Sequence, residues 1–259
     1  MSNTQHASRC ARVALTIMLG LAAALCQAGT DNKQAPHAMT HAQPRSDTLS
    51  ARQQAIIPIA AFGAAGDLPQ LSSALNQGLD AGLTVNDTKE ILVQLYAYAG
   101  FPRSLNALGE LMQTLDARKM RGIQDVEGRT PSRAAPKGDA LMAAGTANQT
   151  KLTGAPVTGA LFDFAPAVND YLRTHLFGDI FERDNLDWQS RELATVSMLS
   201  ALQGVDSQLQ AHVRISMNTG LTEGQLRQLT DVLADRVDAE PAQRARAALG
   251  RHLATPAPR

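Results

Sequence analysis

Apolar residues recur with the three-to-four-residue spacing of amphipathic helices along most of the chain, and no segment alternates apolar and polar residues convincingly, as a strand would. Ser50 and Gln53 have the spacing of a capping box, Thr84 with Asp87 begins another helix, and Pro102 suits a first helical turn. The first half therefore predicts four helices, over about residues 50–65, 67–82 and 84–100 and from 102 onward.

The second half of the chain follows the same plan. One helix is predicted over about 188–202, a tight turn over 203–206, and a second helix over about 207–219. Thr222 with Gln225 begins the next helix. Short turns between helices indicate antiparallel hairpins, so the expected fold class is all-α.

Two short blocks of sequence occur twice, with the same offset between their copies. Gln70-Leu71, followed by Ala-Gly-Leu-Thr at 81–84, returns as Gln208-Leu209, followed by Thr-Gly-Leu-Thr at 219–222. Two copies of one helical unit indicate a duplicated fold whose copies pack together. Site residues can then be divided between the copies.

Two polar segments of low complexity separate these parts. One is expected to be a disordered spacer, and the other, rich in Gly, Ala, Pro, Lys and Thr, to be a linker. The predicted order is a signal peptide over 1–28, a spacer over 29–48, a first repeat over 49–120, a linker over 121–157 and a second repeat over 158–252.

The N-terminus has the pattern of a secretory signal peptide. Arg9 and Arg12 precede an apolar stretch from Val13 to Leu25, and Cys26-Gln27-Ala28 offers small residues at the cleavage positions. An uncleaved anchor is the alternative, but about 13 apolar residues fall short of the roughly 20 that span a bilayer. Lipidation of Cys26 is a second alternative, disfavoured by bulky Leu25. A periplasmic or secreted protein is expected, with no membrane contact after cleavage.

Composition excludes several classes of function. Both cysteines, Cys10 and Cys26, belong to the signal segment, so the mature chain would have no disulfide, thiolate metal site or cysteine nucleophile. The 24 basic and 24 acidic side chains give no net field to attract nucleic acid. His37 and His41 lie in the polar spacer, where we interpret them as ordinary tail residues. No metal is expected.

Two ionisable residues of the second half stand on apolar helix faces. Glu192 falls in the middle of an apolar arc, so its carboxylate needs a partner such as Arg191, or a pocket that raises its pKa. His212 borders an apolar arc on the next helix, about 7 Å from Glu192 along the hairpin axis. They are a candidate general acid/base pair. The alternatives are a structural ion pair and an ordinary core histidine.

The first half lacks this pair, because the offset of the repeated blocks places Gln54 and Ala74 at the equivalent positions. It has instead Tyr96 and Tyr98, next to a Gly-Phe-Pro turn at 100–102. Their hydroxyls could serve as donors on a concave surface. The alternative is that both are ordinary core tyrosines.

Together these residues resemble the carboxymuconolactone decarboxylase family and its relatives, the alkyl hydroperoxidase D-type proteins. The second copy shows an Arg-Glu pair at 191–192, a Leu-x-x-His-Val-Arg helix at 209–214 and Asn-x-Gly-Leu-Thr at 218–222. The first copy shows the rest of the pattern, from Glu90 to Pro102 with Asn106 beyond it. The resemblance covers about residues 50–118 and 175–250.

The resemblance implies an all-helical fold, obligate homo-oligomers and cofactor-free decarboxylation of a small lactone. It implies that His212 donates or accepts the proton and that Glu192 tunes it. Arg191 or Arg214 would hold a substrate carboxylate, and no cofactor is expected. With Tyr96 from the run above, the expected substrate-binding residues are Arg191, Arg214, Tyr96, Tyr98 and Asn106.

Two hypotheses of function follow. The first is a cofactor-independent lyase or related acid/base enzyme acting on a small carboxylated or lactone substrate. The second is a non-catalytic periplasmic binding or scaffold protein, in which Glu192 and His212 touch but are sealed from solvent. Peroxidase chemistry of the hydroperoxidase branch relies on a Cys-x-x-Cys pair, and here the corresponding turn carries Gly204 and Ser207.

Overall fold

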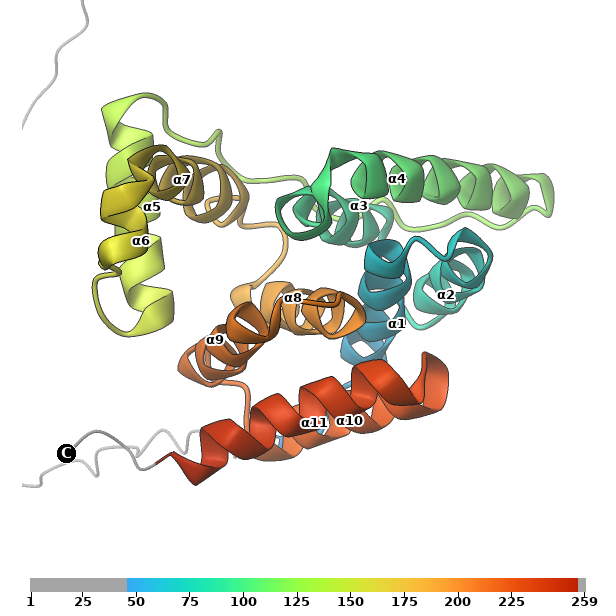
Figure 1. Ribbon diagram of the computed structural model, residues 1–259. Helices are drawn as coiled ribbons and strands as arrows, with labels where there is room; N and C mark the ends of the chain where they lie inside the picture. Colours follow the sequence, from blue (N-terminus) through green and yellow to red (C-terminus); the bar gives the residue numbers. More distant parts are fainter. Residues whose placement is uncertain (1–45, 256–259) are drawn as a thin grey trace, which may run out of the picture. The chain divides into compact units, whose positions relative to one another are not determined.

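The computed structural model describes residues 46–255, and all regular structure in that part of the chain is helical (Figure 1). The all-α prediction is confirmed. The expected signal peptide and most of the expected spacer lie outside the described residues. The elements are α1 (Ala51–Ala65), α2 (Leu68–Asp80), α3 (Val85–Gln94), α4 (Tyr96–Met120), α5 (Asp139–Thr153), α6 (Ala160–Phe164), α7 (Pro166–Tyr171), the π-helix η1 (Leu172–Ile180), α8 (Trp188–Ala201), α9 (Asp206–Asn218), α10 (Glu223–Arg236) and α11 (Ala239–Ala254).

Local capping explains where several helices begin. The predicted capping boxes are present at Ser50, Thr84 and Thr222, where each hydroxyl accepts a hydrogen bond from the backbone N–H three residues later. The third helix ends at Gln94 rather than near residue 100 as predicted. Gly100, with φ 81°, instead breaks the helical backbone inside α4, a conformation that favours glycine.

The core is centred on α1 and α8, which pack against each other (Figure 1). Residues 55–64 of α1 and 190–200 of α8 are all buried. Helices α2, α3 and α4 pack around α1, and α9, α10 and α11 around α8. A helix that is buried on every side needs small or apolar residues on all of its faces. Helix α1 has such residues throughout its buried part, and α8 has them at most positions.

The two halves of the core have matching helix bounds. Helices α2 and α9 have the same length and are separated by the offset of the repeated sequence blocks, and the starts of α3 and α10 are separated by the same offset. The segment before α1 contacts a helix of the second half, and the segment before α8 contacts the equivalent helix of the first half. The Leu49 N–H bonds Gln228 of α10 at 2.6 Å, and Arg183 bonds Glu90 of α3. These spacings are what a duplication predicts, and the duplication itself stays a prediction.

The expectation of a low-order linker over 121–157 was wrong for its second part, which forms α5. Leu152 of α5 is buried in a second apolar cluster with Leu176 and Phe177 of η1. Gly145 allows this approach, since a Cβ there would lie 1.8 Å from the backbone oxygen of Arg173. The small residues that indicated low complexity thus serve close helix packing.

The first part of that segment has no helix and runs back to α3. The N–H groups of Val85 and Asn86, at the start of α3, donate to the carbonyls of Val126 and Glu127, both at 2.9 Å. These bonds satisfy helix-terminal donors that would otherwise lack partners. Among the described residues, no helix has both the length and the apolar character required to cross a membrane.

Candidate functional site

Glu192 and His212 meet across the hairpin formed by α8 and α9. Glu192 Oε2 lies 2.8 Å from His212 Nδ1. The two side chains are therefore in direct contact, although their positions differ along the hairpin axis. Glu192 has no exposed surface, and His212 keeps 7% of its surface exposed. A carboxylate can only accept, so with Glu192 ionised Nδ1 donates and Nε2 is left for another partner.

Tyr98 of α4 closes one side of this pair. Its ring meets the ring of His212 edge-on, with centroids 5.5 Å apart and planes at 81°. The Tyr98 hydroxyl and Glu192 Oε1 are both buried without a hydrogen-bond partner among the described residues. Burial, and then the charge of Glu192, raise the pKa of Tyr98, so its hydroxyl stays protonated. Unpartnered polar atoms are rare in protein interiors, so two of them beside one histidine make this pair the candidate site.

Arg191 is not placed to hold a substrate. Its guanidinium is fully buried, bonded to Glu90 Oε2 at 3.0 Å and to Gln94 Oε1 at 3.2 Å. Burial raises the pKa of Glu90, but hydrogen bonds from Arg183 and the charge of Arg191 outweigh it and lower that pKa. Burial lowers the pKa of Arg191, and this outweighs the charge of Glu90, which raises it. The structure therefore uses Arg191 to join α8 to α3, which corrects the expected substrate role.

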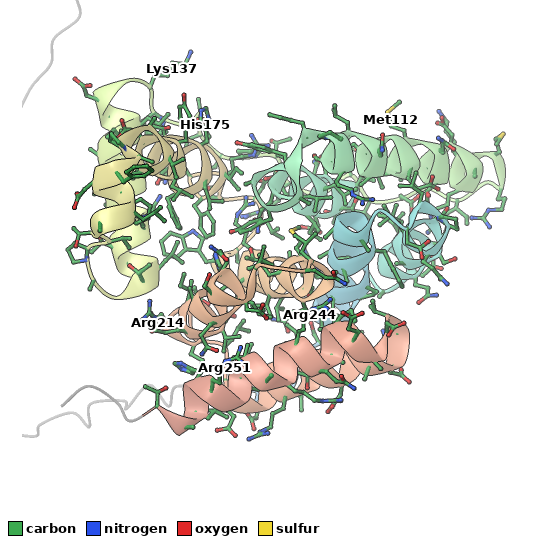
Figure 2. The ribbon with its side chains drawn as sticks, in the orientation of Figure 1. Met112, Lys137, His175, Arg214, Arg244 and Arg251 are labelled. Atoms are coloured by element: carbon green, nitrogen blue, oxygen red, sulfur yellow. The ribbon has the colours of Figure 1, made fainter. Side chains whose placement is uncertain are left out.

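Arg214 and Asn106 also lie apart from the pair. Arg214 is exposed, because two residues along a helix turn it away from His212. It lines a different cavity, of about 590 Å³, with Asn218 and His252, and Figure 2 labels it on the outer side of α9. Asn106 is exposed on α4. The structure does not bring either residue to His212.

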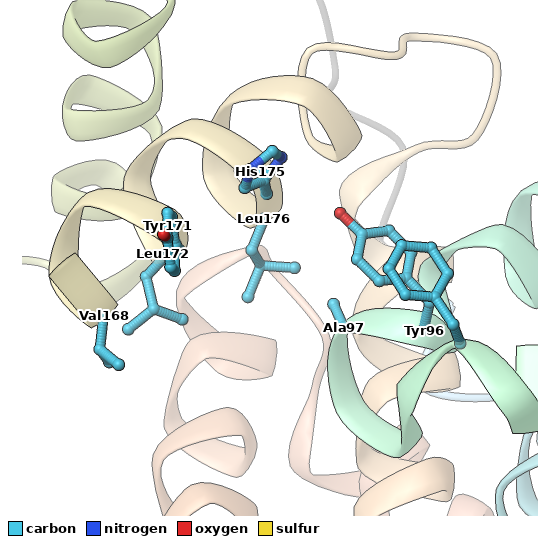
Figure 3. A pocket seen from close by; sticks show the side chains of 8 residues that line it. Tyr96, Ala97, Val168, Tyr171, Leu172, His175 and Leu176 are labelled. Carbon is cyan, nitrogen blue, oxygen red and sulfur yellow. The ribbon is translucent and has the colours of Figure 1, made fainter.

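Tyr96 lines an apolar cavity of about 390 Å³ between the start of α4 and η1 (Figure 3). It stacks on Phe101, with ring centroids 4.6 Å apart and planes at 6°. Burial, together with the charge of Asp179, raises the pKa of Tyr96, so its hydroxyl remains a donor. The lining residues are Tyr96, Ala97, Phe101, Val168, Tyr171, Leu172, His175 and Leu176.

Five of the eight lining residues were missed by the sequence reasoning, because no motif marked residues 160–187. Tyr171 and His175 are spaced four apart, which places them on one helix face, and that spacing was the available signal. His175 also pairs with Asp179, with its Nδ1 3.3 Å from Oδ2. The unusual π-helix carries much of this wall, and π-helical turns often occur at functional sites.

Apolar side chains of the second cluster and Tyr98 lie between this cavity and His212. Leu176 lines the cavity and packs in the second apolar cluster with Ile215 of α9. Tyr98 packs on the same cluster and touches His212 from there. Glu192 and His212 are themselves absent from the cavity linings found in the described residues. The described part of the chain also has no cluster of His, Cys, Asp and Glu that could hold a metal ion.

Comparison with known protein families gives one match. Residues 166–250, from the start of α7 into α11, match the family model described as carboxymuconolactone decarboxylase family. This region contains both Glu192 and His212, and it leaves out the first half, where the resemblance stays a prediction. No curated protein matches the chain.

Proposed function

We propose that this protein, whose residues 166–250 match the carboxymuconolactone decarboxylase family model, is a cofactor-independent acid/base enzyme acting on a small carboxylated or lactone substrate. His212 transfers the proton, and Glu192 is its positioning residue. The observation that carries the proposal is the 2.8 Å contact between Glu192 Oε2 and His212 Nδ1 in a buried setting. Such a contact fixes the tautomer and the ring orientation of a catalytic histidine.

The proposed reaction is a decarboxylation. The carboxylate is carried by a ring carbon next to the lactone carbonyl or conjugated with it through a C=C bond. The bond between the carboxylate carbon and this ring carbon breaks, CO₂ leaves, and the electron pair passes to the lactone carbonyl as an enolate or dienolate. Protonated His212 then donates through Nε2 to the ring carbon, and Glu192 stabilises the imidazolium before the transfer. The reaction needs no oxidant or reductant.

The cavity at Tyr96 is the proposed substrate entrance. Its volume of about 390 Å³ falls within the range of about 300–1,000 Å³ of small-molecule sites. Apolar walls suit a ring, and the Tyr96 hydroxyl suits a carbonyl or carboxylate oxygen. Tyr98 lies against His212, so the proposal requires its ring to move aside for substrate to reach His212.

The proposal is tested by CO₂ release from a panel of carboxylated γ-lactones. Wild-type protein and His252→Gln, a histidine on α11 remote from the pair, should release CO₂ at equal rates. His212→Gln should reduce kcat at least about 100-fold, the usual contribution of a general acid, while circular dichroism shows unchanged helical content. Full activity in His212→Gln would exclude the mechanism.

A second candidate is a non-catalytic binding or scaffold protein. It is favoured by the complete burial of Glu192 and the 7% exposure of His212, which leave the pair nearly sealed. This candidate predicts ligand binding without turnover, and equal binding by wild type and His212→Gln. Peroxidase activity is the least supported, because the described residues contain no cysteine and the chain's two lie at positions 10 and 26.

Export and self-association remain part of the proposal. Cell fractionation of the full chain tests the periplasmic or secreted location, with N-terminal sequencing to find the cleavage site. Sedimentation of the mature chain tests the expected homo-oligomer.

A further inference from the structure

A further cavity, of about 430 Å³, lies between α3, α4 and the segments around residues 130 and 184. It shares no lining residue with the cavity at Tyr96, and it contains neither Glu192 nor His212. Its size is also typical of a small-molecule site. Its lining residues are Asn86, Lys89, Glu90, Val93, Leu108, Leu111, Met112, Leu115, Thr130, Pro131, Arg183 and Asn185.

One wall of this cavity is a continuous apolar strip of α4. Leu108, Leu111, Met112 and Leu115 follow the spacing of one helix face and extend over about 10 Å. Met112 is 68% exposed and lies on the outward side of α4 (Figure 2). Contiguous apolar surface that faces solvent is characteristic of a binding groove.

The other end of the cavity is cationic. Arg183 Nε bonds both oxygens of Glu90, at 3.0 and 2.9 Å, and Arg191 bonds Glu90 from behind, so two guanidinium groups share one carboxylate. Lys89 adds a further cation, and it is paired only with Glu127 on the exposed surface, at 3.0 Å. Three cations, Lys89, Arg183 and Arg191, are therefore paired with two carboxylates, Glu90 and Glu127, which leaves an excess of one positive charge.

A further polar residue, Asn185, lines this end of the cavity. Asn185 is 8% exposed and lines the cavity, and its Oδ1 has no hydrogen-bond partner among the described residues. Such an atom normally has a protein or solvent partner. Asn185 therefore adds a largely buried polar side chain to this end of the cavity lining.

We propose that this cavity binds an amphipathic carboxylate, such as a medium-chain fatty acid. The hydrocarbon chain lies along the apolar strip of α4, and the carboxylate lies between Lys89 and Arg183. An apolar wall that leads to an excess of positive charge matches both ends of such a molecule. The inference does not depend on the proposed acid/base function.

The test is calorimetric titration of the full chain with decanoate, 1-decanol and decyltrimethylammonium. Decanoate should bind most tightly and decyltrimethylammonium most weakly. Met112→Asp should weaken decanoate binding at least about tenfold, equivalent to about 1.4 kcal/mol, because a carboxylate then stands on the apolar wall. Met120→Asp is the control, a methionine of α4 outside the cavity that is 83% exposed, and it should leave binding unchanged.

The charged end is tested with Lys89→Gln. This variant should weaken decanoate binding about threefold or more and leave decanol binding unchanged, which corresponds to the loss of a partly exposed charge pair. Lys119→Gln, at the far end of α4, should change neither. Absence of decanoate binding to the wild type would overturn the proposal, and so would equal losses in Met112→Asp and Met120→Asp. A change of oligomeric state in Met112→Asp without decanoate binding would show instead a contact between copies of the chain.

Discussion

The carboxylate of Glu192 lies 2.8 Å from Nδ1 of His212. Among the described residues, neither side chain forms a second hydrogen bond. The equivalent positions of the first half, Gln54 and Ala74, do not form such a pair, and Gln54 bonds the Leu49 carbonyl instead at 2.9 Å. Both members of the candidate acid/base pair therefore come from the second half. The first half contributes Tyr98 to it.

Breaking this pair on one side should destabilise the fold. His212→Leu leaves the carboxylate of Glu192 buried without its partner, and we expect a loss of about 3–5 kcal/mol in the free energy of unfolding. The double variant Glu192→Leu/His212→Leu should recover much of that loss, because it removes the buried charge. Arg214→Leu, on the exposed face of α9, should change stability by less than about 0.5 kcal/mol. Urea unfolding measures all three, and an unchanged His212→Leu would show that the pair does not support the fold.

The ion pair of Glu90 should make stability depend on pH on the acid side. The fold lowers the pKa of Glu90 below its ordinary 4.5, so it favours the ionised form. The contribution of Glu90 to the free energy of unfolding is complete above pH 4.5, and it is lost as the pH falls through the lowered pKa of Glu90. Urea midpoints between pH 7 and pH 3 should therefore decline below 4.5.

The variant Glu90→Gln isolates that effect. It leaves buried Arg191 without its counter-charge, so the protein should be less stable at pH 7, and its acid-side decline should be shallower. Glu223→Gln removes a surface carboxylate that pairs with Arg227, and it should keep the wild-type decline. An equal decline of the urea midpoint below pH 4.5 in wild type and Glu90→Gln would contradict the assignment of this decline to Glu90.

Filling the cavity at Tyr96 should impair substrate binding. Ala97→Leu places a larger side chain in the lining, and we expect KM to rise about tenfold or more, with kcat less affected, because entry rather than proton transfer is obstructed. Ala117→Leu is the same change at an exposed position of α4 outside the cavity. Equal kinetics for the two variants would show that substrate does not enter here. Fluorescence of Trp188, the chain's single tryptophan, offers a second readout because it packs on the cluster behind the cavity.

The contact between α5 and η1 should be sensitive to a single methyl group. Gly145→Ala would place a Cβ 1.8 Å from the Arg173 backbone oxygen, and the cost should reach about 1–3 kcal/mol or more. Gly109→Ala meets nothing within 4 Å, so on helix propensity it should stabilise the protein by up to about 1 kcal/mol. Thermal unfolding should separate the variants in opposite directions. A stable Gly145→Ala would mean that α5 does not pack this closely.

The features that the sequence could predict are those with local signals. Capping boxes at Ser50, Thr84 and Thr222 fixed helix starts, because a cap involves residues three positions apart. The contact of Glu192 with His212 followed from helix faces and a short turn. Tyr98 joined that pair only because the first half folds against the second, which the sequence indicated through its repeat.

The features that the sequence could not predict depend on residues far apart. The partner of Arg191 is Glu90, 101 positions earlier, so a cation that suited a substrate carboxylate was already bound within the core. Helix α5 was missed because its small residues are explained only by close packing on η1. The cavity at Tyr96 was missed in part because its second wall, including His175, lies in a segment without a recognisable motif.

Hydrogen–deuterium exchange at the substrate tests the central claim most directly, because it detects proton transfer even when no CO₂ leaves. In D₂O, wild-type protein should label the carbon next to the carbonyl of a carboxylated γ-lactone, as followed by NMR. His212→Gln should slow that labelling at least about 100-fold, Glu192→Gln should slow it less, and His252→Gln should match the wild type. Labelling by His212→Gln at the wild-type rate would contradict the account.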